Sequence, residues 1–350
     1  MKSQMHTPIS VIATEVVLPG IVEPTGLQIR ERVLAPLHRG EALVQIEASG
    51  VSFAEQAMRR GLYPMQPAFP FVPGYDFVGR LIAVGKGVPQ NRIGTRVAAV
   101  TKLGGWASHV VVPARHLVCV PEEVSPAQAE TVLVNGITAW QMLFREAEVK
   151  AGQTILVHGA NGGVGTVLCQ LAHHFGIRVI GTASPRHHDA LRAMGVEPLD
   201  YNAPDLAEQV RALAPAGVDA VFDHLGLESA RISYGLLARK GSLIVYGNAL
   251  AFNQKTSMMR VFLRLMGQLA LWKLRPKAHY VTFYNFWGGR LLRPSAFRAR
   301  LAQDLTTLFD LLRTGAIDPP IAAAFPITEA AAAMTLAESR TVRGKVILVP

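Results

Sequence analysis

A glycine-rich turn, HGANGGVG at residues 158–165, has the residue types and spacing of a phosphate-binding loop. It follows the apolar run TILVH and leads into a second apolar stretch, as a turn between a strand and a dinucleotide-binding helix does. Gly162 would let the backbone approach a pyrophosphate, and Gly165 would let the helix pack closely on the sheet. The phosphate would then lie at the N-terminus of that helix. Ala160 replaces the first glycine of the usual G-x-G-x-x-G pattern and adds one methyl group to the turn.

The end of the next predicted strand indicates which dinucleotide the turn would bind. Enzymes that prefer NAD carry an Asp or Glu there, about 20 residues after the turn, and bind the ribose 2′-hydroxyl with it. Here the strand in RVIGTASPRHH ends without an acid, and Ser184 and Arg186 follow. Because a guanidinium pairs well with a phosphate, we predict NADPH rather than NADH. The alternative is that Arg186 is a solvated residue at the start of a helix.

The elements predicted around this turn indicate an α/β protein with a parallel, doubly wound sheet. From about Asn135 onward, apolar runs alternate with amphipathic stretches. The first ~130 residues instead have the pattern of short strands between Gly and Pro turns. We expect strands at 154–158, 178–182, 197–200, 219–223, 242–246, 280–286 and 345–350, and helices at 163–175, 187–194, 205–214, 228–239 and 298–315.

Composition excludes several classes of protein. Half of the 350 residues are hydrophobic and 17% are charged, so the chain can bury two cores. Two cysteines, Cys119 and Cys169, are too few for a disulfide framework or a four-cysteine zinc site. The N-terminus, MKSQMHTPIS, has no apolar stretch typical of a secretory signal. We therefore expect a cytoplasmic protein.

The net charge of +10 comes from one segment. Between Glu228 and Asp304 the sequence has thirteen Lys or Arg residues and no acidic residue. Elsewhere 22 basic residues are balanced by 25 acidic ones. The basic character is therefore local, and we do not predict nucleic-acid binding.

Within this basic segment, residues 256–275 predict an amphipathic helix. Its arginines gather in one arc of about 100° on a helical wheel, and apolar residues fill nearly all the rest. That arc contains Arg260, Arg264, Gly267, Gln268 and Arg275. The charges argue against a span across a bilayer. Three alternatives stay open: a helix that lies at a membrane surface, an apolar lid over a lipophilic substrate, and packing within the protein or its dimer.

Five stretches carry a family resemblance: ASGVSFAEQAMRRGLYP, FVPGYDFVGRLIAVGKGV, NGITAWQML, HGANGGVGTVLCQLA and ESRTVRGKVILVP. In this order they resemble the medium-chain dehydrogenase/reductase superfamily, closest to its zinc-free NADPH:quinone oxidoreductase branch. Ala160 fits the A-x-G-G-V-G form of that branch. The chain is similar also to vesicle-membrane homologues of the branch, in which comparable insertions occur.

The resemblance implies a division into two domains. Residues 1–132 and 291–350 would form a GroES-like, β-rich catalytic domain. Residues 133–290 would form a Rossmann domain that binds NADPH and carries the basic insertion at 251–278. The resemblance also implies a homodimer through edge strands of the Rossmann domain.

Zinc-dependent members of this superfamily place a Cys and a His–Glu pair in the first domain. The matching positions here hold Ser52 and Tyr75–Asp76, and neither Ser nor Tyr is a usual zinc ligand. The neighbours His173–His174 and His187–His188 would point in different directions on a helix, which favours surface histidines. We therefore predict no metal site.

The resemblance also implies which residues meet the cofactor and the substrate. Tyr63 would lie near the nicotinamide and donate a hydrogen bond or a proton to the nascent enolate. The alternative is that it only anchors a turn. Ser52 and Ala57 stand where relatives carry an Asn and a second Tyr, so this substrate site differs from theirs. The expected cofactor contacts are Phe53, Thr138, Asn161, Gly162, Gly163, Val164, Gly165, Ser184, Arg186, Tyr201 and Asn248.

These residues suit hydride transfer to a conjugated electrophile, in which the protein supplies position and polar stabilisation. The leading hypothesis is a zinc-independent oxidoreductase that transfers hydride from NADPH to a small lipophilic quinone or other conjugated carbonyl. One alternative is an enoyl reductase that acts on lipid or polyketide-like substrates. Another is a membrane-associated NADPH-binding protein with weak catalysis.

Overall fold

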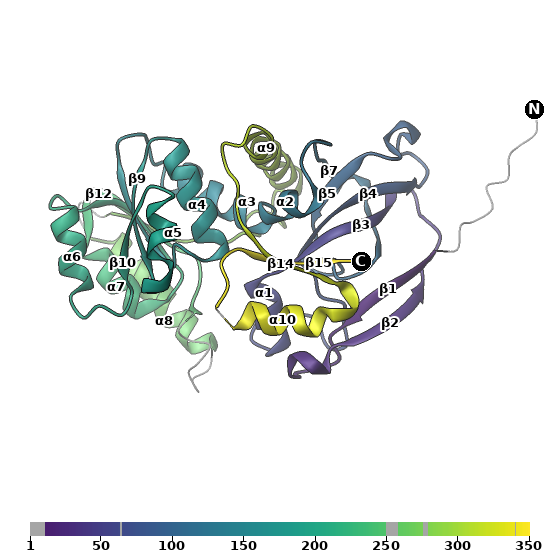
Figure 1. Ribbon diagram of the computed structural model, residues 1–350, viewed down its shortest axis with the longest axis horizontal. Coiled ribbons are helices and arrows are strands. Elements are labelled where there is room, and N and C mark those ends of the chain that lie inside the picture. Colours follow the sequence, from purple (N-terminus) through teal and green to yellow (C-terminus); the bar gives the residue numbers. More distant parts are fainter. Residues whose placement is uncertain (1–10, 64, 250–257, 276–278, 340) are drawn as a thin grey trace, which may run out of the picture. The chain divides into compact units, whose positions relative to one another are not determined.

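A computed structural model describes residues 11–63, 65–249, 258–275, 279–339 and 341–350 (Figure 1). The chain divides into two compact units. The first contains Met1–Val134, Leu305–Arg313 and Pro320–Pro350, and the second contains Asn135–Asp304 and Thr314–Pro319.

The first unit is built on a seven-stranded sheet to which both ends of the chain contribute. The C-terminal strand β15 pairs antiparallel with β3, with Val346 opposite Val51, and parallel with β14. Strand β3 in turn pairs with β4 and β6, so it ties distant parts of the sequence together. Its strands are β3 (Glu41–Val51), β4 (Asp76–Val84), β5 (Arg96–Val100), β6 (His109–Pro113), β7 (Val118–Cys119), β14 (Ile321–Pro326) and β15 (Lys345–Val349). A separate two-stranded sheet contains β1 (Ile12–Val17) and β2 (Gln28–Val33).

Alternating apolar residues of these strands form the core of the first unit. Val44, Phe77 and Val97 lie in one buried cluster, which β3, β4 and β5 share. A second cluster joins Trp106 to apolar side chains of β15 and the last helix. The helices of this unit are α1 (Phe53–Arg59), α2 (Pro126–Thr131) and α10 (Ala330–Glu338).

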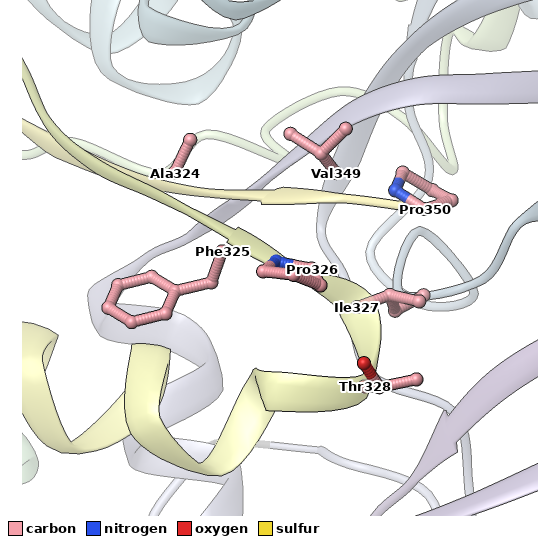
Figure 2. Close-up of a pocket in the computed structure, with 7 residues that line it drawn as sticks. All are labelled: Ala324, Phe325, Pro326, Ile327, Thr328, Val349 and Pro350. Carbon is pink, nitrogen blue, oxygen red and sulfur yellow. The ribbon is translucent and has the colours of Figure 1, made fainter.

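An open apolar hollow of about 400 Å³ lies beside β14 and the end of β15 (Figure 2). Its lining residues are Ala324, Phe325, Pro326, Ile327, Thr328, Val349 and Pro350. None of these side chains is ionisable, and Thr328 has the one polar side chain. A binding site needs convergent polar groups to orient a ligand, so this hollow is not a candidate.

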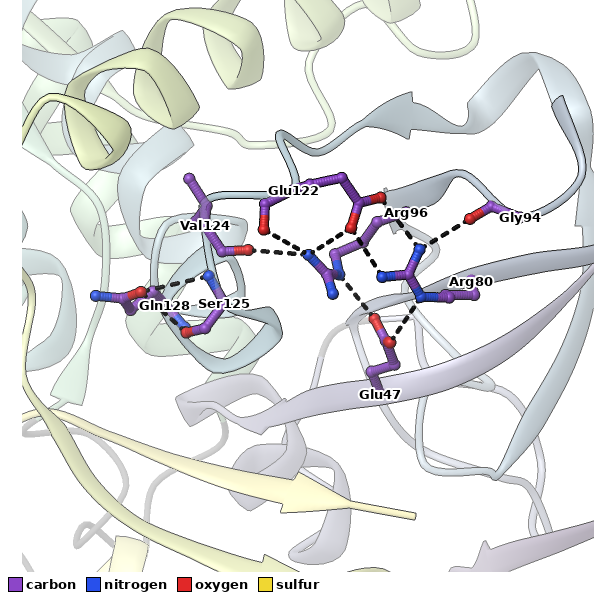
Figure 3. A network of polar contacts seen from close by, with 8 residues as sticks. All are labelled: Glu47, Arg80, Gly94, Arg96, Glu122, Val124, Ser125 and Gln128. Carbon is purple, nitrogen blue, oxygen red and sulfur yellow. Dashed lines mark hydrogen bonds and ion pairs between the residues drawn. The ribbon is translucent and has the colours of Figure 1, made fainter.

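A network of ion pairs ties three strands of the first unit to the segment before α2 (Figure 3). Arg96 on β5 donates from Nε to Glu47 on β3 at 2.9 Å. Arg80 on β4 donates from Nη2 to Glu122 at 2.8 Å, and this bond holds the pKa of Glu122 below its usual range. Because Glu122 is exposed, the network contributes little to stability.

The second unit is a parallel six-stranded sheet in the order β10-β9-β8-β11-β12-β13. Ile155, Leu156 and Val157 of the central strand β8 are fully buried, as expected for a parallel strand with both faces covered. The strands are β8 (Thr154–His158), β9 (Arg178–Ala183), β10 (Val196–Asp200), β11 (Val218–Asp223), β12 (Leu237–Val245) and β13 (Tyr280–Phe283). The predicted α/β class with a parallel sheet is confirmed.

Helices α4 to α8 lie around this sheet (Figure 1). Helix α9 belongs to both units, since its residues up to Asp304 lie in the second unit and Leu305–Arg313 lie in the first. A π-helical turn at Gln141–Glu146 follows α3. The bounds of the helices are α3 (Val134–Trp140), α4 (Gly163–His174), α5 (His188–Arg192), α6 (Leu206–Leu213), α7 (Leu227–Tyr234), α8 (Met258–Lys273) and α9 (Pro294–Arg313).

The largest error in the predicted boundaries of the second unit lies between α7 and β12. Smaller ones are β13, which ends at Phe283 instead of residue 286, and α9, which begins at Pro294 instead of residue 298. The helix expected at 228–239 ends at Tyr234, and β12 already begins at Leu237 instead of residue 242. Lys240 and Gly241 were expected to lie between the two elements. Instead Lys240 adopts φ +68° inside the strand, next to a register shift in the β11–β12 pairing. An irregular strand of this kind has no regular periodicity to predict.

Candidate functional site

The glycine turn connects β8 to α4, as the sequence predicts. Gly162 is the N-cap of α4 and has no side chain with which to cap the helix. A Cβ on Gly165 would lie 2.2 Å from the carbonyl oxygen of Gly159, so only glycine permits this close packing of helix on strand. Asn161 and Val164 belong to the same turn. The backbone N–H groups at the start of α4 are therefore placed to bind an anion.

Asn135 packs against this turn, and the sequence did not single it out. A Cβ on Gly163 would lie 2.5 Å from the side-chain nitrogen Nδ2 of Asn135. Asn135 is buried near the start of α3. In the sequence, Asn135 is only a polar residue at the start of the apolar stretch NGITAWQML. Its contact with the glycine turn becomes visible only in the folded structure.

Side chains at the ends of β8, β9 and β11 hold the glycine turn in place. The backbone N–H of Gly159 donates to Oγ1 of Thr182 at 3.2 Å. The Nε2 atom of His158 lies 3.0 Å from the hydroxyl of Ser233, which itself donates to Asp223 at 2.9 Å. Burial lowers the pKa of His158, against the opposing effect of the Asp223 charge. His158 is therefore neutral at pH 7 in the folded protein.

This network predicts a loss of stability in mild acid. Because the pKa of His158 is lower in the folded than in the unfolded state, the unfolded state binds more protons below pH ~6.5. The loss should be about 1.4 kcal/mol for each unit of pKa difference, once the pH falls below the folded-state pKa. Urea unfolding of the wild type and of His158→Gln between pH 7.5 and about 5 measures it, and the variant should depend less on pH. Equal pH dependence of the two proteins would contradict the assignment.

Ser184, Arg186 and Tyr201 lie at the carboxyl ends of the next two strands. Ala183 of β9 pairs with Asp200 of β10, and the N–H of Tyr201 donates to the carbonyl of Ala183 at 3.4 Å. The side chain of Arg186 is exposed, and its Nε lies 3.2 Å from Nε2 of His187. Since β8, β9 and β10 are neighbours, the fold brings these three residues to the same sheet edge as the glycine turn.

Asn248 follows β12 at this same edge. Its Oδ1 would lie 2.2 Å from a Cβ on Gly226, which adopts φ +123°. Its Nδ2 is buried and finds no hydrogen-bond acceptor among the described residues. A buried amide without an acceptor is costly, and a bound group could satisfy it. The glycine cradle and this amide both fit a dinucleotide.

Thr138 is buried in α3, close to a second polar network. The hydroxyl of Tyr284 donates to Gln141 at 2.9 Å, and Gln141 donates to Asp304 at 2.6 Å. Burial raises the pKa of Tyr284, while its hydrogen bond with Thr138 opposes that shift. Thr138 is thus fixed by contacts within its own unit.

The remaining candidates, Phe53 and Tyr63, lie in the first unit. Phe53 begins α1 and is 45% exposed. Ser52 caps this helix, and the carboxylate of Glu55 accepts the N–H of Ser52 at 2.9 Å. The hydroxyl of Tyr63 lies 2.7 Å from that of Tyr75. Tyr63 and Tyr75 therefore form a hydroxyl pair close to the start of β4.

The positions that correspond to zinc ligands of the zinc-dependent enzymes have different partners here. Ser52 caps α1, Tyr75 contacts Tyr63, and Asp76 lies 4.0 Å from the Lys345 ammonium. In the part of the chain that the structure describes, no three His, Cys, Asp or Glu side chains gather closely enough to hold a metal ion.

Comparisons with known proteins identify the family. The model for the alcohol dehydrogenase GroES-like domain matches residues 38–122, and the model for zinc-binding dehydrogenases matches residues 195–348. The human synaptic vesicle membrane protein VAT-1 homolog is 34% identical over 318 residues, which are 89% of this chain and 79% of that protein. The chain belongs to the medium-chain dehydrogenase/reductase superfamily. The predicted GroES-like fold of the β-rich part is thereby confirmed.

Solved structures place it in the zinc-free quinone oxidoreductase branch of this superfamily. Escherichia coli quinone oxidoreductase complexed with NADPH superposes with a TM-score of 0.83 at 27% identity, over 96% of this chain and 100% of that one. The CurF ER cyclopropanase from the curacin A biosynthetic pathway gives 0.81 at 25% identity, over 96% and 99%. This dehydrogenase/reductase is an oxidoreductase, and its cofactor is NADPH, as predicted.

Proposed function

We propose that this oxidoreductase transfers hydride from NADPH to a quinone or another small conjugated carbonyl compound without zinc. The Tyr63–Tyr75 hydroxyl pair carries the proposal, since it puts a proton donor where zinc-dependent relatives have a metal ligand. The likeness to a quinone oxidoreductase supports it. Such acceptors need no metal to polarise them, because conjugation already spreads the incoming negative charge.

Each candidate residue has a role in this reaction. When bound, NADPH supplies the hydride. The N–H groups at the start of α4 would hold its pyrophosphate, and Ser184 and Arg186 would hold its 2′-phosphate. Tyr63 would give a proton to the carbonyl oxygen as negative charge develops there. Phe53, Thr138, Tyr201 and Asn248 would contact the cofactor as well and fix the orientation of its nicotinamide and adenine rings.

A substrate comparison tests the proposal. Purified protein is mixed with NADPH and either 1,2-naphthoquinone or an enoyl thioester, and the loss of NADPH absorbance is followed. Turnover of the quinone is expected. Turnover of the thioester alone would favour enoyl reduction, the function that the likeness to the CurF ER cyclopropanase suggests. Tight NADPH binding with neither turnover would favour a binding protein with weak catalysis.

Helix α8 suggests a second role, contact with an anionic membrane surface. Leu265, Leu269 and Trp272 are buried in the core of the second unit, so one face of the helix packs within the protein. Another face is apolar and exposed: Met259 is 64% and Leu263 is 60% exposed. The arginines predicted for the polar arc, Arg260, Arg264 and Arg275, are exposed. Among the described residues, no helix has the length and hydropathy to span a bilayer.

Co-sedimentation with vesicles tests this second role. Deleting the helix would uncover the core, so surface variants are needed. Binding to phosphatidylserine vesicles should fall at least tenfold in Arg260→Glu/Arg264→Glu, because each basic residue near an anionic surface contributes about 1 kcal/mol. Leu263→Ser should weaken it as well, whereas Ile21→Ser, at a similarly exposed site, should not. Absence of wild-type binding to anionic vesicles would contradict the idea.

We also propose a cytoplasmic location and a homodimer. Strand β13 (Tyr280–Phe283) is an edge of the parallel sheet as described, and an edge strand has free backbone groups with which to pair with a second copy. Sedimentation equilibrium of the purified protein would measure the dimer.

A further inference from the structure

The backbone of Tyr75 is fixed on both sides by contacts that do not involve Tyr63. Its N–H donates to the buried carboxyl of Glu55 at 2.7 Å. Its carbonyl accepts the N–H groups of Thr101 at 2.9 Å and Lys102 at 3.1 Å. Before it, Gly74 has φ +103°, and a Cβ there would lie 2.2 Å from a backbone nitrogen of the neighbouring loop. The ring of Tyr75 is therefore held in one direction before any substrate binds.

Tyr75 presents its hydroxyl to Tyr63. The two hydroxyl oxygens lie 2.7 Å apart, and the rings meet edge to face at 75° with centroids 6.1 Å apart. Tyr75 is 4% exposed, whereas Tyr63 is only partly buried. Solvent and substrate can thus reach the pair from the side of Tyr63, and Tyr75 supports it from the interior.

Lys102 brings a positive charge to the same pair. Its Nζ lies 5.4 Å from the ring centroid of Tyr63 and donates to the carbonyl of Met65 at 3.3 Å. Both Lys102, with φ +80°, and Met65, with φ +52°, adopt the left-handed conformation that side chains disfavour. Such strain gathers at functional sites, where the surrounding structure maintains it. Here two strained residues lie beside one tyrosine.

We propose that Tyr75 and Lys102 are positioning residues that support Tyr63 as the proton donor. The inference rests on the proposed function. Hydride adds to the conjugated carbonyl compound, and an electron pair moves onto its oxygen. The O–H bond of Tyr63 breaks, and its proton passes to that oxygen. The phenolate that remains accepts a hydrogen bond from Tyr75 and lies near the Lys102 ammonium, until it takes a proton back from water.

Ultraviolet titration of the tyrosines tests the proposal without substrate or cofactor. The difference in phenolate absorbance between the wild type and Tyr63→Phe isolates the titration of Tyr63. Tyr75→Phe and Lys102→Met should each move that titration to higher pH, because each removes a group that stabilises the phenolate. Lys102→Arg should restore it. The matched control is Tyr280→Phe, which should leave the titration of Tyr63 unchanged. Tyr280 and the residue that its hydroxyl contacts, Glu146, both belong to the second unit.

Kinetics provide a second readout. Tyr75→Phe should lower kcat at least tenfold and shift its pH profile, with the KM for NADPH unchanged, because the lost hydrogen bond acts on a charged group. In the Tyr63→Phe variant, the additional substitution Tyr75→Phe should not lower kcat any further. An unchanged Tyr63 titration in both Tyr75→Phe and Lys102→Met would overturn the proposal. If instead those titrations shift but no quinone or enone is reduced, the proposed function fails and the tyrosine pair stands.

Discussion

Replacing Lys345 with Met should lower the free energy of unfolding by about 3–5 kcal/mol. The Lys345 ammonium is buried, 3.1 Å from Glu130 and 4.0 Å from Asp76. Burial raises the pKa of Glu130 well above its usual range, and it raises the pKa of the nearby Glu55 as well. Burial alone would lower the pKa of Lys345, but the carboxylates around it outweigh burial and raise it. Among the described residues, Lys345 is the one cation in this cluster. Its removal leaves the buried carboxyl groups of Glu130, Asp76 and Glu55 without a positive charge beside them.

Urea unfolding at pH 7 measures the effect. Lys86→Met, at an exposed lysine of the same unit, should change the free energy of unfolding by no more than about 0.5 kcal/mol. Lys345→Met combined with Glu130→Gln should recover part of the loss, because the double variant no longer leaves Glu130 without its partner. A loss below about 1 kcal/mol in Lys345→Met would show that the cluster does not depend on this charge.

Such a cluster could not be predicted from the sequence. Lys345 begins the strand KVILVP and has the pattern of a solvated strand end, and Glu130 lies in a helix more than two hundred positions earlier. Only the pairing of β15 with β3, beside α2, brings them together. The glycine turn and its helix were predictable, because strand, turn and helix are consecutive in sequence and each has its own local pattern.

Tyr75 and α8 show the same limit in two further ways. Comparison with zinc-dependent relatives indicated that Tyr75 is not a metal ligand. It did not indicate that Tyr75 contacts Tyr63. For α8 the helical wheel placed Arg260 and Arg264 on an exposed arc, which also contains the exposed Leu271. The apolar side, however, comprises two faces, one buried around Leu269 and one exposed around Leu263. Hydrophobicity alone does not tell which apolar face packs on a sheet that is formed elsewhere in the chain.

Replacing Arg186 with Ala should raise the KM for NADPH about 10- to 100-fold, with little change in kcat. Arg186 follows β9, which lies next to the strand that leads into the glycine turn, and the 2′-phosphate of the cofactor is expected at the carboxyl ends of these two strands. A hydrogen bond to a charged group contributes about 1.5–3 kcal/mol, which gives that range. The KM for NADH should change far less, since NADH has no phosphate at this position. Initial rates with both cofactors measure the change in preference.

Arg192 provides the control for this variant. It is an exposed arginine of the neighbouring helix α5 and pairs with Asp189 at 2.8 Å, so Arg192→Ala should leave both KM values unchanged. Arg186→Glu should raise the KM for NADPH more than Arg186→Ala does and should make the enzyme prefer NADH. A carboxylate repels the 2′-phosphate and can accept a hydrogen bond from a ribose hydroxyl. An equal rise of KM for NADPH and NADH in Arg186→Ala would instead mean that Arg186 supports the fold of the turn. In that case the cofactor preference would have to come from Ser184 and Tyr201.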